Sequence, residues 1–396
     1  MLAGFKGDKL LDEEQILSRR GAIGAFLAMD VMRSARAKSR AGADICHLEV
    51  GEPGTQAPLL VRERAKRHLD EGLVGYTEAL GLPDLRARIA RHYDDTYGVS
   101  IDAEQVVVTT GSSAGFVLAF LATLDAGDKV AIMRPGYPCY REILKALDLV
   151  PVDLPVGFET GWQPQIEDVE AAIAQEGVKA LLLASPANPT GALLDDALIT
   201  DVAALCADKQ VWLMMDEIYH GLIYEKATIT AAGLNDRVIV LNSFSKYYSM
   251  TGWRIGWMVV PPALTRALEI LNQNLFISAP SLSQIAAEVA FDATDELEAI
   301  KAGYQRKRAV LRVGLRDVGL DKMAPLDGAF YAYVDVSDFT DDSLAFSKFL
   351  LESYGIAACP GLDFDPVQGH LMMRFSYAGP EDEIGEFGRR MKQAFL

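Results

Sequence analysis

The chain has 396 residues, half of them apolar, and a formal net charge of −17 at pH 7. A chain of this length and apolar content can bury a core large enough for more than one domain. The acidic balance argues against a nucleic-acid-binding surface or an anionic membrane surface, because phosphate groups attract clustered lysine and arginine. We therefore expect neither nucleic acid nor a membrane as a partner.

Four cysteines are widely spaced and form no CxxC pair: Cys46, Cys139, Cys206 and Cys359. This spacing indicates neither a zinc site nor a disulfide framework. Charged residues interrupt the first fifteen positions before a signal-peptide core could form, and no apolar run approaches the roughly 18 residues of a membrane span. We expect reduced thiols, a cytoplasmic location and no metal site.

The first part of the chain predicts a covering helix and then a backbone turn that a ligand can approach. Apolar residues recur at helical spacing within 21–38. The piece 47–54, HLEVGEPG, ends in glycine and proline, and at Gly51 the backbone can come close to a ligand. An exposed turn with Tyr76 follows, and then a helix that begins at Pro83, where the missing N–H costs nothing.

Five continuous apolar runs then end in polar, glycine or proline residues: 106–113, 129–138, 179–191, 211–221 and 238–246. Runs without alternation indicate strands that are buried on both faces. Helical stretches such as 165–174 and 197–207 separate them, and this order is typical of a mostly parallel sheet. Ligands bind beyond the carboxyl ends of such strands, where the polar endings gather.

Helical patterns dominate after residue 262, with a long charged helix over 295–317 that bridges two domains. Three strands and two helices are predicted beyond it, at 329–336, 355–360 and 371–378, and at about 342–353 and 381–394. We predict an α/β protein whose large domain has a mostly parallel sheet flanked by helices, with a smaller α+β domain. The expected divisions are an N-terminal segment joining the small domain, the large domain, and the small domain with its linking helix: 1–49, 50–290 and 291–396.

The stretch from Val238 to Trp257 places Lys246 behind Ser243 and Ser245, with Arg254 shortly after. Two hydroxyls and an arginine at a strand end can seat a phosphate, and a lysine amine can form a Schiff base with an aldehyde. Pyridoxal phosphate is the cofactor that needs both. The alternative is a solvated loop with scattered charges.

Asp216 ends an apolar strand, where an unpaired carboxylate is costly, so a cation must face it. A protonated pyridine nitrogen would serve, and the ring would then act as an electron sink. Tyr219 and Asn188 offer a phenol and an amide to the ring oxygen. The separations of 28 residues between Asn188 and Asp216, and of 30 between Asp216 and Lys246, each fit one strand, helix and loops. Taken singly, these residues could instead be a helix cap, ordinary packing and a turn former.

A second phosphate contact is predicted at the start of a helix. Gly111, Ser112 and Ser113 follow a strand and precede a helical pattern, so their N–H groups and hydroxyls can hold a phosphate at the helix N-terminus. Tyr137, in the loop RPGYP, can stack on a flat cofactor, or it is simply a turn tyrosine.

Six motifs occur in one order: GEP at 51–53, NPTG at 188–191, DEIY at 216–219, SFSK at 243–246, GWRIGW at 252–257 and MRFSYA at 373–378. With them the sequence resembles the fold type I pyridoxal-phosphate enzymes, specifically the class I/II aminotransferases of the aspartate and aromatic aminotransferase kind. The resemblance runs from about residue 20 to the end. Ala114 and Gly115 replace a glutamine-alanine pair of many relatives, which leaves the start of that helix open.

The resemblance implies roles for the residues at the cofactor ring. Lys246 would form the internal Schiff base, Asp216 would pair with the pyridine nitrogen, and Tyr219 and Asn188 would bond the ring oxygen. Tyr137 would stack on the ring. The Asn188-Pro189 bond is expected to be cis, as in the enzymes that the sequence resembles.

The resemblance also implies how phosphate and substrate are held. The phosphate would bind Ser112, Ser113, Ser243, Ser245 and Arg254, and Tyr76 would reach the phosphate of the neighbouring subunit. Arg374, aided by the Gly51 backbone, would grip the substrate α-carboxylate, a bidentate task for a guanidinium. Standing alone, Arg374 would more often be an edge-strand residue in a salt bridge.

The implied activity is that of a homodimeric aminotransferase with shared active sites. By a ping-pong mechanism it would pass an amino group from an amino acid to a 2-oxo acid, with Lys246 moving a proton as acid and base. Two alternatives stay open: a C–S lyase with the same scaffold and cofactor, and a non-catalytic ligand sensor.

The substrate side chain is expected to be neutral or aromatic. Ser113 stands where one subgroup that prefers acidic substrates has a lysine, and the covering segment 24–27, GAFL, is apolar and includes Phe26. Burying a carboxylate without a partner is expensive. Arg19 and Arg20 could reverse this expectation by turning inward.

Overall fold

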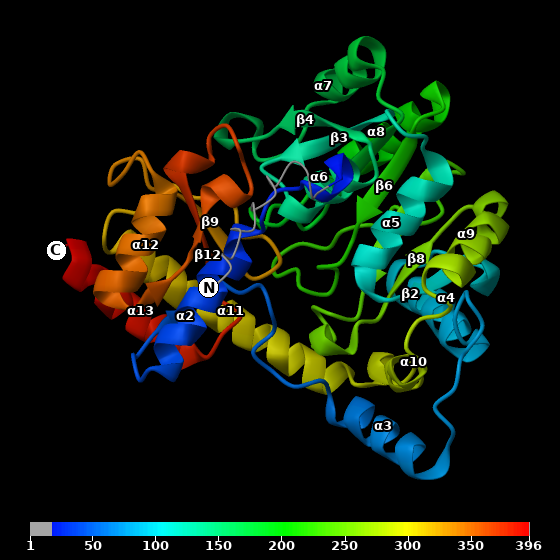
Figure 1. Ribbon diagram of the computed structural model, residues 1–396, viewed down its shortest axis with the longest axis horizontal. Helices are drawn as coiled ribbons and strands as arrows, with labels where there is room; N and C mark the ends of the chain where they lie inside the picture. The colour runs from blue at the N-terminus through cyan, green and yellow to red at the C-terminus, as the bar shows by residue number, and fades with distance from the viewer. Residues whose placement is uncertain (1–17, 396) are drawn as a thin grey trace, which may run out of the picture.

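The protein is described by a computed structural model that covers residues 18–395. Residues 1–17 of the expected N-terminal segment lie outside the described part. Figure 1 shows two parts side by side: a broad twisted sheet with its own helices, and a smaller sheet with its own helices. The candidate site lies between them.

The large sheet has seven strands in the order β2-β8-β7-β6-β5-β3-β4. Their bounds are β2 Val106–Thr109, β3 Lys129–Arg134, β4 Val150–Pro155, β5 Ala180–Ala184, β6 Trp212–Asp216, β7 Val238–Ser243 and β8 Gly256–Val259. All neighbours pair in parallel except β8, which is antiparallel to both β2 and β7. The predicted mostly parallel sheet is confirmed.

The strands are buried on both faces, as their continuous apolar runs predict. In β5, Leu181 and Leu183 belong to one apolar cluster, whereas Leu182 between them belongs to the cluster on the opposite face. Strand β4 was not predicted, because its two prolines and Asp153 break the apolar run and several of its side chains are partly exposed.

Helices cover both faces of this sheet. They are α4 Pro83–Tyr97, α5 Gly111–Thr123, α6 Pro138–Ala146, α7 Ile166–Ala171, α8 Asp196–Lys209, α9 Pro262–Leu275 and α10 Ser281–Ala287. A π-helical turn, Ala172–Glu176, continues α7. Helix α3, Leu59–Glu71, was not predicted; it packs on α10 and projects from the body at the bottom of Figure 1. Across residues 18–395, none of the helices combines the length and the apolar character needed to cross a membrane.

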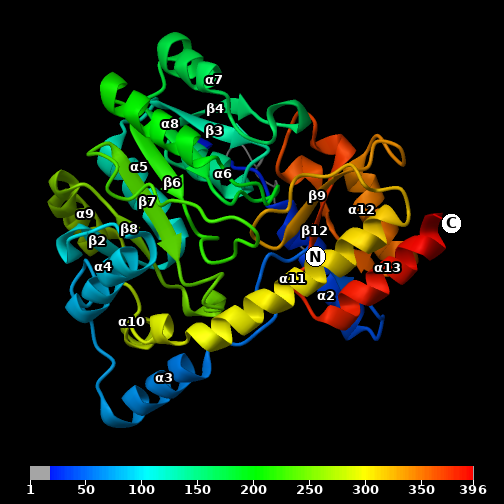
Figure 2. The same ribbon diagram turned by 180° about the vertical axis from the view of Figure 1, so that it is seen from behind.

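The smaller sheet is antiparallel, in the order β11-β12-β9, and a two-stranded parallel pair, β1 and β10, lies beside it. The strands are β1 Cys46–His47, β9 Tyr331–Asp335, β10 Ile356–Ala357, β11 Cys359–Pro360 and β12 Met372–Ser376. The helices are α2 Leu27–Arg40, α12 Ser343–Tyr354 and α13 Glu381–Phe395. Figure 2 shows α11, Thr294–Arg316, running from the region of α10 to this smaller sheet.

Helix α2 begins six residues later than its apolar pattern predicts. The Asp363 carboxylate accepts hydrogen bonds from the N–H groups of Leu27 (2.8 Å) and Ala28 (2.9 Å), so it caps the helix at that point. The residues just before Leu27 are not helical and run across to the large sheet, where Gly24 N–H donates to Glu142 on α6 at 2.6 Å.

Candidate active site

A cavity of about 420 Å³ lies beyond the carboxyl ends of β5, β6 and β7 and reaches the small sheet. Most of the predicted site residues line it: Gly51, Ser112, Ser113, Tyr137, Asn188, Asp216, Tyr219, Ser245, Lys246, Arg254 and Arg374. The strand ends therefore gather their polar residues at one edge of the sheet, as parallel topology requires.

Lys246 lies in the turn that follows β7. Its Nζ donates a hydrogen bond to the Gly51 carbonyl at 2.6 Å. Burial lowers the pKa of this amine to about 8, and the nearby charge of Arg374 acts in the same direction, against an opposing effect of Glu52. A larger fraction of the amine is thus uncharged and nucleophilic near neutral pH than for an ordinary lysine.

Asp216 is the last residue of β6, and both of its carboxylate oxygens are engaged. The Tyr140 hydroxyl donates to Oδ2, and the Ile218 N–H donates to Oδ1 at 3.0 Å. Burial raises the Asp216 pKa to about 6, while these two bonds and the charge of Lys246 oppose the rise. Tyr140 was not predicted. The sequence signal that could have indicated it is its spacing: Tyr140 follows Tyr137 by one helical turn, so both can face the same cavity.

Tyr219 and Asn188 reach the cavity from two different segments. The Tyr219 hydroxyl lies 2.7 Å from the hydroxyl of Tyr331, a second aromatic contact that sequence reasoning missed. Asn188 lies in the loop after β5, and its Oδ1 accepts a hydrogen bond from Arg374 Nη1 at 3.0 Å. The Asn188-Pro189 bond is cis, which confirms that expectation.

Arg374 lies in β12, the middle strand of the small sheet, and is almost fully buried. Its Nη2 donates to the Glu49 carbonyl at 2.7 Å, and the guanidinium sits 4.4 Å from the Tyr331 ring centroid. Among the described residues, Nε of Arg374 has no hydrogen-bond partner although it is buried. A guanidinium held in this way, with no carboxylate paired to it among residues 18–395, suits an anionic ligand.

One end of the cavity is formed by the start of α5. The helix begins at Gly111, and no side chain caps its first turn, so backbone N–H groups are available for an anion. Gly111 has φ +71°, and an added Cβ would lie 2.5 Å from Nη2 of Arg254. The positive φ favours glycine at this position, and a larger residue would displace the Arg254 side chain.

The helix start is therefore not delayed by the unusual Ala114-Gly115 pair. Gly115 is buried against Leu241 and Met258, where an added Cβ would meet both at 3.3 Å. A small residue at this point lets α5 pack closely on β7 and β8.

Two of the predicted residues do not line the cavity. Ser243 lies behind Ser245; its hydroxyl donates to the Ile255 carbonyl (3.0 Å) and lies 2.9 Å from Ser245 Oγ. Tyr76 is 88% exposed on the surface, away from the cavity of its own chain.

The wall formed by the N-terminal segment and α2 is apolar except for Arg36. Phe26 meets the Tyr137 ring edge-on at 5.9 Å, and Met29 and Met32 follow on α2. Arg19 pairs with Asp148 on the surface at 2.6 Å. Neither Arg19 nor Arg20 lines the cavity.

These groups fit the cofactor that the sequence predicts. The cavity joins an amine of lowered pKa, a buried carboxylate for a ring nitrogen, a helix start with an arginine for a phosphate, and a buried guanidinium with an unpaired Nε for a substrate carboxylate. Each requirement of pyridoxal phosphate and an amino acid is met by a separate group.

The comparisons with known proteins agree. The family model for aminotransferase class I and II matches residues 43–390. The chain is 45% identical to the valine-pyruvate aminotransferase of Mycobacterium tuberculosis, covering 94% of this chain and 96% of that protein. It is 34% identical to the arginine-pyruvate transaminase of Pseudomonas aeruginosa, covering 87% and 89%.

Solved structures give the same result. A crystal structure of an aminotransferase from M. tuberculosis superposes with a TM-score of 0.93 at 45% identity, covering 96% of this chain and 98% of that one. An aspartate aminotransferase from Thermus thermophilus with maleate gives 0.90 at 31% identity, covering 95% and 99%. These likenesses favour transamination over the lyase and sensor alternatives. The chain belongs to the class I and II aminotransferases, fold type I pyridoxal-phosphate enzymes that transfer an amino group from an amino acid to a 2-oxo acid through a lysine Schiff base in a ping-pong mechanism.

Proposed function

We propose that this aminotransferase prefers neutral, apolar amino acids as donors, valine among them, and pyruvate as the acceptor. The observation that carries the proposal is the apolar wall of Phe26, Met29 and Met32 beside the tyrosine that flanks the cavity. The names of two relatives, valine-pyruvate and arginine-pyruvate aminotransferase, support pyruvate as the acceptor.

The roles of the site residues follow from their places. When bound, pyridoxal phosphate supplies a ring that withdraws electrons from the substrate Cα. Lys246 would hold the cofactor and then move a proton at Cα, and Asp216 would keep the ring nitrogen protonated. Arg374, with the Gly51 backbone, would orient the substrate through its α-carboxylate.

The remaining predicted residues would hold the rest of the cofactor. Tyr219 and Asn188 would donate to its ring oxygen, and Tyr137 would stack on the ring. The phosphate would bind the α5 start and nearby groups: Ser112, Ser113, Ser245 and Arg254, with Ser243 orienting Ser245 from behind.

The charge of the side-chain wall supports a neutral donor. Arg36 is the cation of α2 that lines the cavity, and Glu49, whose carboxylate is buried and bonded to His47 at 2.9 Å, lines it as well. The positive charge at this wall is thus opposed by a negative one. Leaving a substrate carboxylate without a dedicated cation costs about 2 kcal/mol or more, which is about 30-fold in kcat/KM.

The test is a screen of donors with pyruvate and with 2-oxoglutarate as acceptors. We expect valine, alanine or phenylalanine to exceed aspartate by at least about tenfold in kcat/KM. Arg36→Met should leave the valine rate unchanged. A tenfold preference for aspartate that Arg36→Met abolishes would overturn the proposal and identify Arg36 as the selecting cation.

We propose further that two subunits share their active sites. Tyr76 has no use in the cavity of its own chain, and it lies beside Leu73, which is 89% exposed. Leucines of the preceding helix α3 are exposed as well: Leu59, Leu60 and Leu69. Several exposed leucines in one projecting segment favour burial against a second copy.

Mixing inactive Tyr76→Ala and Lys246→Ala proteins tests the shared site. Each heterodimer would contain one site in which both residues are intact, so we expect up to about a quarter of wild-type activity after exchange. No recovery, with mass spectrometry proving that subunits exchanged, would contradict sharing. Light scattering gives the oligomeric state independently.

We further expect the fold to divide at about residues 50 and 290 into a cofactor-binding part and a smaller part. All four cysteines have free thiols, which supports a location of the protein in the reducing cytoplasm. Limited proteolysis and cell fractionation test them separately.

A further inference from the structure

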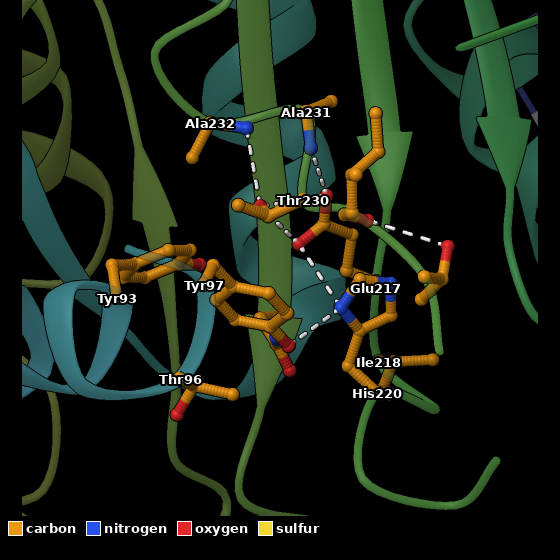
Figure 3. Close-up of polar contacts among 12 residues, drawn as sticks. Tyr93, Thr96, Tyr97, Glu217, Ile218, His220, Thr230, Ala231 and Ala232 are labelled. Atoms are coloured by element: carbon orange, nitrogen blue, oxygen red, sulfur yellow. Dashed lines mark hydrogen bonds and ion pairs between the residues drawn. The ribbon is translucent and has the colours of Figure 1, made fainter. Parts of the chain in front are cut away.

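The turn that carries Asp216 and Tyr219 has a second set of polar side chains, which do not line the cavity. Figure 3 shows Glu217 and His220 turned toward α4. The Glu217 carboxylate accepts hydrogen bonds from the Thr230 hydroxyl (2.8 and 3.0 Å) and from the Ala231 N–H (2.7 Å). This side of the turn is therefore tied to the segment at 230–231.

His220 ties the same turn to a helix and to a loop. Its Nδ1 lies 2.8 Å from the Tyr97 hydroxyl on α4, while the Glu217 carboxylate stays 3.5 Å away (Figure 3). Burial lowers the His220 pKa to about 3, against an opposing effect of the Ser185 backbone, so the ring is neutral. Tyr97 then donates to Nδ1, and the ring carries its proton on Nε2.

Ser185 begins the loop that carries Asn188. Its N–H donates to the Asp216 carbonyl at 3.1 Å, and its hydroxyl accepts from Leu194 N–H at 3.1 Å. The bond from Ser185 to Asp216 therefore joins the loop of Asn188 to the turn of Tyr219, and His220 fixes this turn against α4. These two segments carry the groups proposed for the ring oxygen of the cofactor.

We propose that His220 is a positioning residue: it keeps the side chains of Tyr219 and Asn188 within hydrogen-bond distance of the cofactor's ring oxygen. In this way it sets how readily the Lys246 Schiff base loses its proton. The inference rests on the proposed roles of those two residues. Donors to the ring oxygen stabilise its negative charge, which is more exposed once the neighbouring Schiff base is deprotonated. Displacing the donors therefore makes the Schiff base harder to deprotonate and raises its pKa.

The titratable groups around His220 are Tyr97 and His92 on α4 and Glu217 on its own turn, and the substitutions below leave each of them in place except Tyr97 in Tyr97→Phe. Around Lys246 they are Asp216, Arg374, Arg254 and Glu52. A change in the Schiff base then reports the position of the donors and not a lost charge.

The experiment is a pH titration of the absorbance of the purified, cofactor-loaded enzyme. We expect His220→Leu to raise the Schiff-base pKa by about one unit, a tenfold change in the proton equilibrium. His220→Gln, whose amide oxygen can accept from Tyr97, should restore the value to within about 0.3 units. Tyr97→Phe removes only the donor to the ring and should shift the pKa in the same direction by less.

Tyr93→Phe is the matched control. Tyr93 lies one turn earlier on α4, is buried, and accepts from Trp257 at 3.1 Å, and none of its hydrogen bonds involves His220. It should lose stability without moving the Schiff-base pKa. An unmoved pKa in His220→Leu and Tyr97→Phe would overturn the inference, as would an equal shift in Tyr93→Phe. If the leucine variant does not fold, Tyr97→Phe against Tyr93→Phe decides alone.

Failure of the proposed site is distinguishable from failure of this inference. Borohydride reduction of wild-type enzyme followed by peptide mapping tests whether Lys246 carries the cofactor. A label on another lysine refutes the site itself, whereas a label on Lys246 with unmoved titrations refutes only the role of His220.

Discussion

Replacing Arg374 by lysine separates the binding of the substrate carboxylate from the chemistry at Cα. The guanidinium is buried, and two of its nitrogens are held by the Asn188 amide oxygen and the Glu49 carbonyl. A lysine keeps the charge but loses the planar fork that grips a carboxylate with two parallel bonds.

The magnitude follows from the hydrogen bonds that are lost. A charge-assisted hydrogen bond contributes about 1.5 to 3 kcal/mol, and one such bond plus the fixed geometry gives a loss of about 2 to 4 kcal/mol. We therefore expect Arg374→Lys to lower kcat/KM for valine by about 30- to 1,000-fold. The protein should also lose stability, because Asn188 and Glu49 lose buried donors.

The assay compares valine with isobutylamine, the same molecule without its carboxylate, by following single-turnover conversion of the bound cofactor. Isobutylamine has nothing for Arg374 to bind, so its slow rate should be nearly the same in wild type and Arg374→Lys. Equal losses for both substrates would refute the assigned contact and place the effect in general damage to the site. Far-ultraviolet circular dichroism of the variant confirms that the fold is intact.

Other substitutions and conditions test the rest of the site. Asp216→Asn should fold normally and lose at least about a thousandfold in kcat, because an amide cannot hold the ring nitrogen protonated; near-normal turnover would count against this role. Gly111→Ala should raise the dissociation constant of pyridoxal phosphate by about tenfold or more in equilibrium dialysis, since the new Cβ meets Arg254 at 2.5 Å. Unchanged affinity would contradict a phosphate site at the start of α5. The rate at which cofactor-free enzyme binds pyridoxal phosphate covalently should rise about tenfold per pH unit and level off near pH 8, because only the uncharged Lys246 amine reacts and burial holds its pKa at about 8. A rise that continues to pH 10 would mean that the amine is not perturbed.

The sequence predicts the parallel core because the strands inside it, β3, β5, β6 and β7, are apolar on both faces. Leu181, Leu182 and Leu183 illustrate this pattern, since neighbouring residues enter opposite clusters. The polar residue at each strand end then marks the site without knowledge of side-chain contacts. Elements at the edge lack these sequence patterns. Strand β4 has prolines and partly exposed positions, and the exposed leucines of α3 disturb the pattern of an amphipathic surface helix.

Contacts between distant segments are the part that sequence patterns miss. Tyr140, Tyr331 and His220 read as ordinary aromatic residues, because their importance depends on partners far along the chain. The late start of α2 belongs to the same class, since the Asp363 carboxylate that caps it lies 336 positions from Leu27. Helical periodicity describes one segment at a time and contains no information on such a cap.

The covering segment before α2 is held in place by its backbone. Gly24, Leu27 and Ala28 are anchored through their N–H groups, to Glu142 on one side of the cavity and to Asp363 on the other. Every amino acid except proline offers the same N–H group. Side chains here that are not buried in the core, such as Phe26 and Met29, can therefore be exchanged while the segment keeps its course, and Lys246, Asp216 and Arg374 stay where they are. The rate of the chemical step and the choice of donor therefore depend on different residues in this protein. A library of variants restricted to these few positions can change the preferred donor without lowering the rate of the chemical step.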